Sequence, residues 1–188
     1  MHQPLFICLD LQRAFVEPGA LRAPRAASAL LECARLLALA RRRRWDIVHC
    51  LLQRDVPRLT ISGAMALPVS GFSPRSCEAV IERQSLSAYG HSAFATLMEA
   101  APHKTALVAG LSASLTFVAT ALDAFERGHR LVIAVDALAA QDGLEAQAPA
   151  HEAVARDIAA RLGFPAAHKH EALVEPLGAI AFKGARND

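Results

Sequence analysis

Three separate places in the sequence carry groups that could take part in acid–base chemistry or bind an anion. Asp10 ends one short apolar run, Arg83 ends another, and a loop of small residues follows Gly110 and leads into a helix. A carboxylate in apolar surroundings is costly unless it is paired, and it can serve as a general acid or base. A guanidinium can bind a carboxylate through two parallel hydrogen bonds. The backbone N–H groups of a loop that begins a helix can bind an oxyanion.

Each feature also has a purely structural interpretation. Asp10 could cap a helix or organise a loop, Arg83 could be an exposed charge before a turn, and Ser112 or Ser114 could cap the following helix. The loop contains no cysteine, histidine or lysine. The hydroxyl of Thr116 would need a base to become a nucleophile, and only Asp10 is a candidate for that base.

The elements that must position these residues alternate along the chain. Apolar runs predict strands, and longer stretches with apolar residues at helical spacing predict helices. The expected strands are 4–11, 46–53, 79–84, 104–110 and 129–138, with a possible edge strand at 170–174. The expected helices are 27–44, 91–100, the stretch that follows Gly110 and ends at Gly128, and 149–164. Residues 54–77 hold three prolines and two glycines and predict a long surface loop that could line a site.

Strands that are apolar throughout and separated by helices indicate a parallel sheet covered on both faces. We therefore expect residues 1–188 to form one domain, a three-layer α/β/α Rossmann-like fold with a mostly parallel sheet of about six strands. Such sheets bind ligands beyond the carboxyl ends of their strands. Asp10, Arg83 and the loop after Gly110 fall at or just past such ends, so we expect them to converge in one cavity.

Composition narrows the range of partners. The formal net charge of +2 does not favour nucleic acid, and the basic run Arg41–Arg44 closes a helix, where cations suit the helix dipole. No apolar segment is long enough for a signal peptide or a membrane span, so the sequence predicts a cytoplasmic protein with no membrane partner. The four cysteines, Cys8, Cys33, Cys50 and Cys77, have no paired spacing. Cys8 and Cys50 lie in expected strands, which indicates that these two are reduced core residues.

Taken in order, these segments resemble the isochorismatase-like hydrolases, a superfamily that includes nicotinamidases and N-carbamoyl amidohydrolases. The family has an aspartate after its first strand, a lysine before a Ser-Ala-Phe triplet, a Gly-Val-x-Thr-x-x-Cys-Val loop, and a strand ending in Asp-Ala. The matching positions here are Asp10 with Gln12 and Phe15 in "DLQRAF", Arg83 with Ser87–Ala88–Tyr89, the loop Gly110–Phe117, the helix residues Thr120, Ala121, Asp123, Ala124 and Gly128, and Asp136–Ala137.

The resemblance places Thr116 at the family's nucleophilic cysteine and Arg83 at its catalytic lysine. Arginine stays protonated in proteins, so an amidase mechanism that uses a thiolate and a lysine is not expected. In the isochorismatases proper, the cysteine position holds a small residue and the aspartate protonates an enol-ether carbon, a role that Asp10 could take. Arg83 would favour the ionised form of Asp10, burial would oppose it, and Arg83 could instead clamp a substrate carboxylate.

The resemblance therefore implies catalytic roles for Asp10, Arg83 and Thr116. It also implies substrate contacts from five further residues: Gln12, Phe15, Tyr89, Ser112 and Ala113. Residues 53–72 contain no histidine, so the metal site of the family's amidases is not expected, and no cofactor is implied. We also expect an unusual cis peptide bond between Leu111 and Ser112, which would aim the N–H groups of Ser112 and Thr116 into the pocket.

Three interpretations of function stay open at this point. The chain could be a divergent hydrolase that acts on a small carboxylate, vinyl ether or amide through Asp10, without a cysteine nucleophile. It could instead be a catalytically inactive family member that binds a small molecule or a partner protein, or a plain interaction module. The expected ligand is small and anionic, and the family implies a homodimer or homotetramer.

Overall fold

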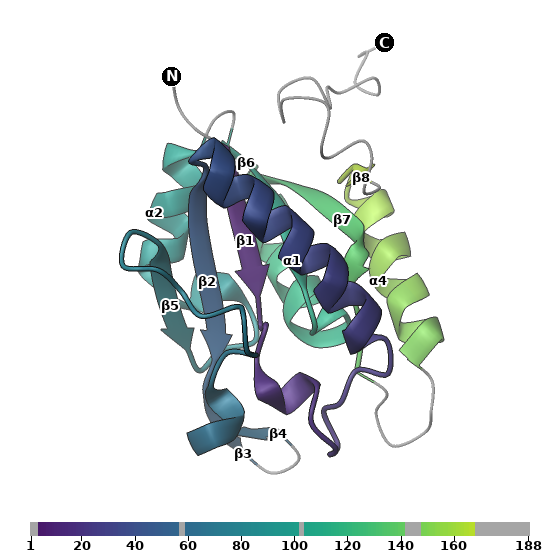
Figure 1. The fold of residues 1–188 in the computed structure, drawn as a ribbon. Helices are drawn as coiled ribbons and strands as arrows, with labels where there is room; N and C mark the ends of the chain where they lie inside the picture. Colours follow the sequence, from purple (N-terminus) through teal and green to yellow (C-terminus); the bar gives the residue numbers. More distant parts are fainter. Residues whose placement is uncertain (1–3, 57–58, 102–103, 142–147, 168–188) are drawn as a thin grey trace.

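The fold is built on a six-stranded sheet whose order is β5-β2-β1-β6-β7-β8, with every neighbouring pair parallel (Figure 1). The computed structural model describes residues 4–56, 59–101, 104–141 and 148–167. The strands are β1 (Leu5–Leu9), β2 (Asp46–Leu52), β5 (Ala79–Arg83), β6 (Thr105–Gly110), β7 (Arg130–Leu138) and β8 (Ala166–Ala167). A separate antiparallel pair consists of β3 (Arg54–Val56) and β4 (Leu59–Ile61). The expected parallel α/β sheet of about six strands is confirmed.

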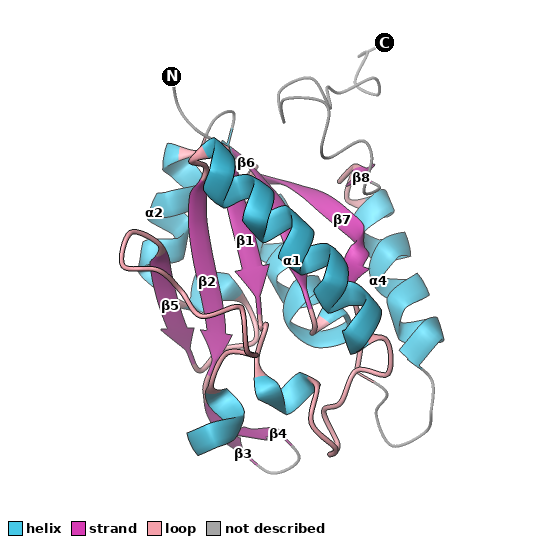
Figure 2. Cartoon of the chain, in the orientation of Figure 1, coloured by secondary structure: helices cyan, strands magenta, loops and turns pink. Residues whose placement is uncertain are grey.

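Helices cover both faces of the sheet and complete the three layers (Figure 2). One face packs against α1 (Ala26–Arg43), and the other packs against α2 (Ser92–Ala100), α3 (Val118–Glu126) and α4 (Ala148–Arg161). Successive strand residues point to opposite faces, so in β1 Phe6 contributes to the cluster on the α1 side and Ile7 to the other. The strands are therefore apolar throughout because both of their faces are buried.

The structure differs from the sequence-based expectations mainly in the connections. The region expected to be a long loop contains the β3–β4 pair and a 3-10 helix at Gly63–Ala66. The helix after β6 begins with a π-helical turn, Ala113–Phe117, and continues as α3. The last described strand is β8, whereas the possible edge strand at 170–174 lies outside the described residues. Cys8 and Cys50 are free and buried, as expected; Cys33 is also free and buried, and Cys77 is exposed.

Two kinds of feature are absent from the described residues. None of the helices there combines the length and the apolar character that spanning a bilayer demands. The described side chains also include no group of three or more His, Cys, Asp or Glu residues placed to hold a metal ion.

A buried carboxylate holds the end of α1 against the sheet and the loop before β5. Both oxygens of Glu78 accept hydrogen bonds from Arg41, at 2.7 and 2.9 Å, and Oε2 also contacts the His49 ring at 2.8 Å and the Arg75 backbone N–H at 2.9 Å. Only 4% of the Glu78 side chain is exposed. Burial by itself would raise the pKa of Glu78, but these hydrogen bonds outweigh it and lower the pKa from 4.5 to about 2.

This shift predicts a pH-dependent contribution to stability. Because the folded pKa is depressed, the contribution is present above about pH 4.5 and is lost as the pH falls toward about 2. We expect Glu78→Gln to lower the free energy of unfolding by roughly 3 kcal/mol at neutral pH. Urea denaturation of both proteins should show this difference shrinking through the same pH window. A difference that stays constant from pH 6 to about pH 3 would contradict the assignment.

Candidate active site

Three side chains from distant parts of the sequence meet at the carboxyl edge of the sheet. Asp10 follows β1, Arg83 ends β5, and Thr116 lies in the π-helical turn after β6. Nη2 of Arg83 donates a hydrogen bond to Oδ1 of Asp10 at 2.6 Å. Thr116 lies beside Asp10, and its hydroxyl donates to the Ser112 carbonyl oxygen at 3.0 Å. The structure thus brings together the three residues expected to be catalytic.

The backbone of Asp10 has a conformation that few residue types tolerate. Its φ is 54°, in the left-handed region, which aspartate and asparagine enter more readily than other non-glycine residues. The backbone N–H still donates to the Cys50 carbonyl at 2.9 Å, so the chain leaves the sheet only after this residue. Such backbone conformations gather at functional sites, where the surrounding fold enforces them.

The Asp10–Arg83 pair is almost completely removed from solvent, with relative exposures of 0% and 3%. Burial raises the pKa of Asp10, while the charge of Arg83 and its hydrogen bond oppose the increase. Among the described residues, two atoms of the pair have no hydrogen-bond partner: Oδ2 of Asp10 and Nε of Arg83. Buried polar atoms are rarely left in this state, so the pair keeps one acceptor and one donor that no described group satisfies.

The loop after β6 approaches the end of β1 very closely. A Cβ atom at Gly110 would lie 2.0 Å from the Leu9 carbonyl oxygen, so only glycine fits there. The expected cis bond between Leu111 and Ser112 is wrong, because the described chain contains no cis peptide bond. A wide π-helical turn changes the chain direction instead, and the Ala113 N–H donates to the Ala139 carbonyl at 3.0 Å. This route avoids the roughly 3 kcal/mol cost of a non-proline cis bond.

Two polar residues outside the predicted set fix this turn in place. The Thr120 hydroxyl donates to the Thr116 carbonyl at 2.6 Å and accepts from the Ala88 N–H at 3.0 Å. Gln141, which follows β7, donates to the Ser112 hydroxyl oxygen at 2.5 Å. Sequence reasoning missed Gln141 as a site residue. Its position just beyond the carboxyl end of a predicted strand was the available signal.

Comparison with known proteins identifies the family. The isochorismatase domain model matches residues 4–163. The chain belongs to the isochorismatase family. It is 28% identical to maleamate amidohydrolase from Pseudomonas putida over 148 residues, an alignment that covers 70% of this chain and 70% of that protein.

Solved isochorismatase-family structures share the fold. An isochorismatase from Pseudomonas putida aligns with a TM-score of 0.76 and 23% identity, covering 90% of this chain and 89% of that one. The N-carbamoylsarcosine amidase from Thermoplasma acidophilum aligns with a TM-score of 0.73 and 20% identity, covering 90% and 98%. An isochorismatase and an N-carbamoylsarcosine amidase therefore share this arrangement of elements, and the site residues must decide the chemistry.

Three of the residues expected to contact substrate in this isochorismatase-family protein make structural contacts. The Gln12 amide donates to the Leu52 and Ala66 carbonyls, at 3.0 and 2.7 Å, and accepts from the Leu52 N–H at 2.8 Å. Phe15 is fully buried in the cluster that contains α1. The Tyr89 hydroxyl bonds to Nδ1 of His129 at 2.7 Å. Ser112 and Ala113, in contrast, belong to the turn that carries Thr116.

Proposed function

We propose that this protein is a divergent isochorismatase-family hydrolase that acts through Asp10 on a small carboxylate, vinyl ether or amide, without a cysteine nucleophile. The observation that carries the proposal is the buried Asp10–Arg83 pair beside Thr116 at the carboxyl edge of the sheet. Removing two charges from water costs free energy, and buried charged pairs with shifted pKa values are concentrated at catalytic sites.

An amide that also carries a carboxylate suits the unpartnered atoms best. An amide offers an N–H to Oδ2 of Asp10 and a carbonyl oxygen to Nε of Arg83, the two atoms that lack partners among the described residues. The name of the relative from Pseudomonas putida, maleamate amidohydrolase, supports the same substrate class. The guanidinium charge would stabilise the oxyanion that forms when the carbonyl is attacked.

In this mechanism Asp10 moves the protons. As a carboxylate it takes a proton from the attacking water, and it then gives that proton to the leaving nitrogen. Burial raises the pKa of Asp10, which favours this return of the proton. Thr116 is a poor nucleophile here because its hydroxyl already donates to Ser112. Arg83 stays protonated throughout and therefore only binds and stabilises charge.

The test is turnover of a substrate panel by the wild-type protein and by Asp10→Asn. The panel contains maleamate, an N-carbamoyl amino acid and a vinyl ether that bears a carboxylate. We expect Asp10→Asn to lower turnover of any active substrate by at least about 100-fold, since general acid–base groups contribute this much or more. Asparagine tolerates the positive φ at this position, and a circular dichroism spectrum that shows the variant folded at the assay temperature would exclude unfolding as the cause. Full activity in Asp10→Asn would refute the proposal.

A second candidate is a family member that binds a small carboxylate without turning it over. It is favoured by the contacts that already occupy the reactive groups, namely Arg83 on Asp10 and the Thr116 hydroxyl on Ser112. If no panel member is hydrolysed but titration calorimetry shows that one of them binds, this candidate replaces the first. The expected homodimer or homotetramer and the cytoplasmic location stay predictions.

A further inference from the structure

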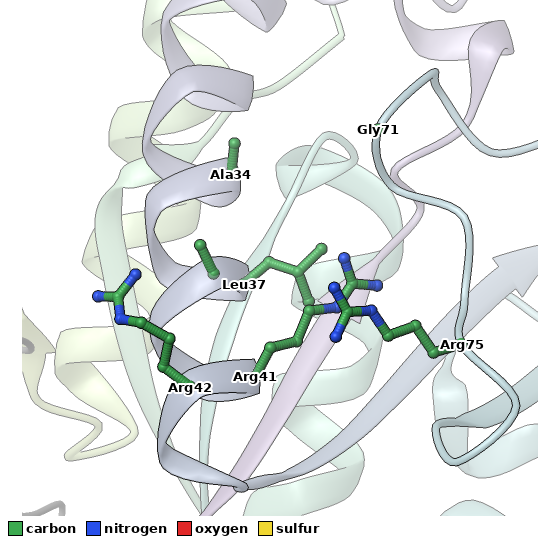
Figure 3. Close-up of a pocket in the computed structure, with 7 residues that line it drawn as sticks. Ala34, Leu37, Arg41, Arg42, Gly71 and Arg75 are labelled. Carbon is green, nitrogen blue, oxygen red and sulfur yellow. The ribbon is translucent and has the colours of Figure 1, made fainter.

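A pocket of about 400 Å³ lies on the surface between α1 and the loop before β5, apart from the Asp10 site. Its wall on the helix side includes Ala34, Leu37 and Ala38, and three arginines line it: Arg41, Arg42 and Arg75. Figure 3 shows Arg41 and Arg75 extending toward one another from the helix and the facing loop, while Arg42 points away from them. This volume falls in the range of small-molecule sites.

The pocket keeps an excess of positive charge. Glu78 neutralises Arg41, and its oxygens are already engaged by Arg41, His49 and the Arg75 backbone. Among the described residues, the guanidinium groups of Arg42 and Arg75 have no hydrogen-bonded or ionic partner. Arg75 therefore brings a positive charge to this pocket without a counter-charge, and Arg42 adds a second one at its edge.

Arg41 is held in a fixed orientation with donors to spare. Its Nε and Nη2 donate to Glu78, and Nη2 also donates to the Ser73 carbonyl at 3.1 Å. A guanidinium carries five N–H donors, so the two on Nη1 are left for a ligand. Arg75 adds a second planar fork from the opposite wall, and such forks match the oxygens of a phosphate.

We propose that this pocket binds a small phosphate monoester, with the phosphate between Arg41 and Arg75 and the organic part against Ala34, Leu37 and Ala38. A phosphate monoester carries close to two negative charges at neutral pH, which suit the uncompensated charge of Arg75 and the spare N–H donors of Arg41. The apolar wall and the volume exceed what inorganic phosphate needs and suit an attached organic group. The pocket lies at the amino end of β5, whereas Arg83 ends that strand, so this inference does not depend on the proposed hydrolase activity.

Titration of the full chain with phenyl phosphate at low ionic strength, followed by calorimetry, tests the proposal. We expect saturable binding that Arg75→Ala weakens by about tenfold or more, because it removes charge-assisted hydrogen bonds. Arg75→Lys keeps the positive charge but loses the two parallel N–H donors of the guanidinium, so its affinity should fall between those of Arg75→Ala and the wild type. The matched control is Arg35→Ala, which removes an exposed arginine from the same helix outside the pocket and should change affinity by less than about twofold.

Other outcomes would overturn the proposal. Binding that does not saturate, or that Arg75→Ala and Arg35→Ala weaken equally, would indicate nonspecific attraction to the basic surface. Loss of binding in Asp10→Asn would place phenyl phosphate in the active site instead. A single-stranded RNA that binds more tightly than phenyl phosphate, with equal sensitivity to both arginine variants, would identify a nucleic-acid surface.

Discussion

Replacing Arg83 with methionine is expected to lower the free energy of unfolding by about 3–5 kcal/mol, the cost of leaving a buried charge without its partner. The Arg83 side chain is 1% exposed, and it holds the Asp10 carboxyl and, through Nη1, the Ser85 carbonyl at 2.6 Å. Methionine fills a similar volume with a flexible apolar chain, so the measured loss reports the charge and hydrogen bonds more than a cavity. Urea denaturation at neutral pH measures the effect.

The double variant with Asp10→Asn and Arg83→Met separates pairing from packing. It removes both charges, and buried pairs replaced on both sides are often close to neutral, so it should recover much of the stability. Asparagine keeps the backbone conformation of Asp10 at φ 54°. In the single Arg83→Met variant, Asp10 loses the charge that held its pKa down. When the pKa of a carboxyl is raised by folding, its contribution to stability is present at low pH and is lost as the pH rises. The stability difference between Arg83→Met and the wild type should therefore be largest near neutral pH and shrink in acid.

A loss below about 1 kcal/mol at neutral pH in Arg83→Met would mean that Asp10 is not a buried carboxylate held by Arg83. That result would remove the observation on which the proposed hydrolase rests.

The sequence was sufficient to predict how Asp10 and Arg83 meet, because the argument needs only the ends of strands. Two apolar runs each end in a charged residue, and parallel strands bring their carboxyl ends to one edge of a sheet. The sheet places β2 between β1 and β5, and the Arg83 side chain is long enough to cross it. The left-handed backbone of Asp10 is not visible in any periodicity, since it depends on where the chain leaves the sheet.

Side-chain directions could not be predicted in the same way. The Gln12 amide binds the backbone at Leu52, the last residue of β2, and at Ala66, which lies in the connection between β2 and β5 whose path no pattern specified. The Tyr89 hydroxyl bonds to His129, which directly precedes β7. Both contacts depend on tertiary packing, which spacing along one chain does not contain.

The double variant Thr116→Cys with Arg83→Lys is expected to gain amide hydrolysis. Thr116 already lies beside Asp10, which could accept the proton of an introduced thiol, in a turn that begins a helix, where the positive end of the helix dipole favours a thiolate. Lysine can exchange a proton with the substrate, whereas arginine cannot. With a nucleophile and a proton-transfer group both supplied, we expect maleamate hydrolysis to rise at least about 100-fold above the wild type. Either single substitution supplies only one of the two groups and should gain much less.

The native thiols must be excluded as the source of any new activity. Cys8, Cys33 and Cys50 are buried, and burial raises the pKa of Cys50 to about 12, so this thiol cannot serve as a nucleophile near neutrality. Cys77 is exposed, and the experiment therefore uses a Cys77→Ser background. Alkylation that abolishes the gained activity, with substrate protecting against it, would assign the reaction to the introduced thiol. A folded double variant that is alkylated normally yet hydrolyses no amide would show that the pocket has diverged beyond its two reactive groups, which would favour binding without turnover.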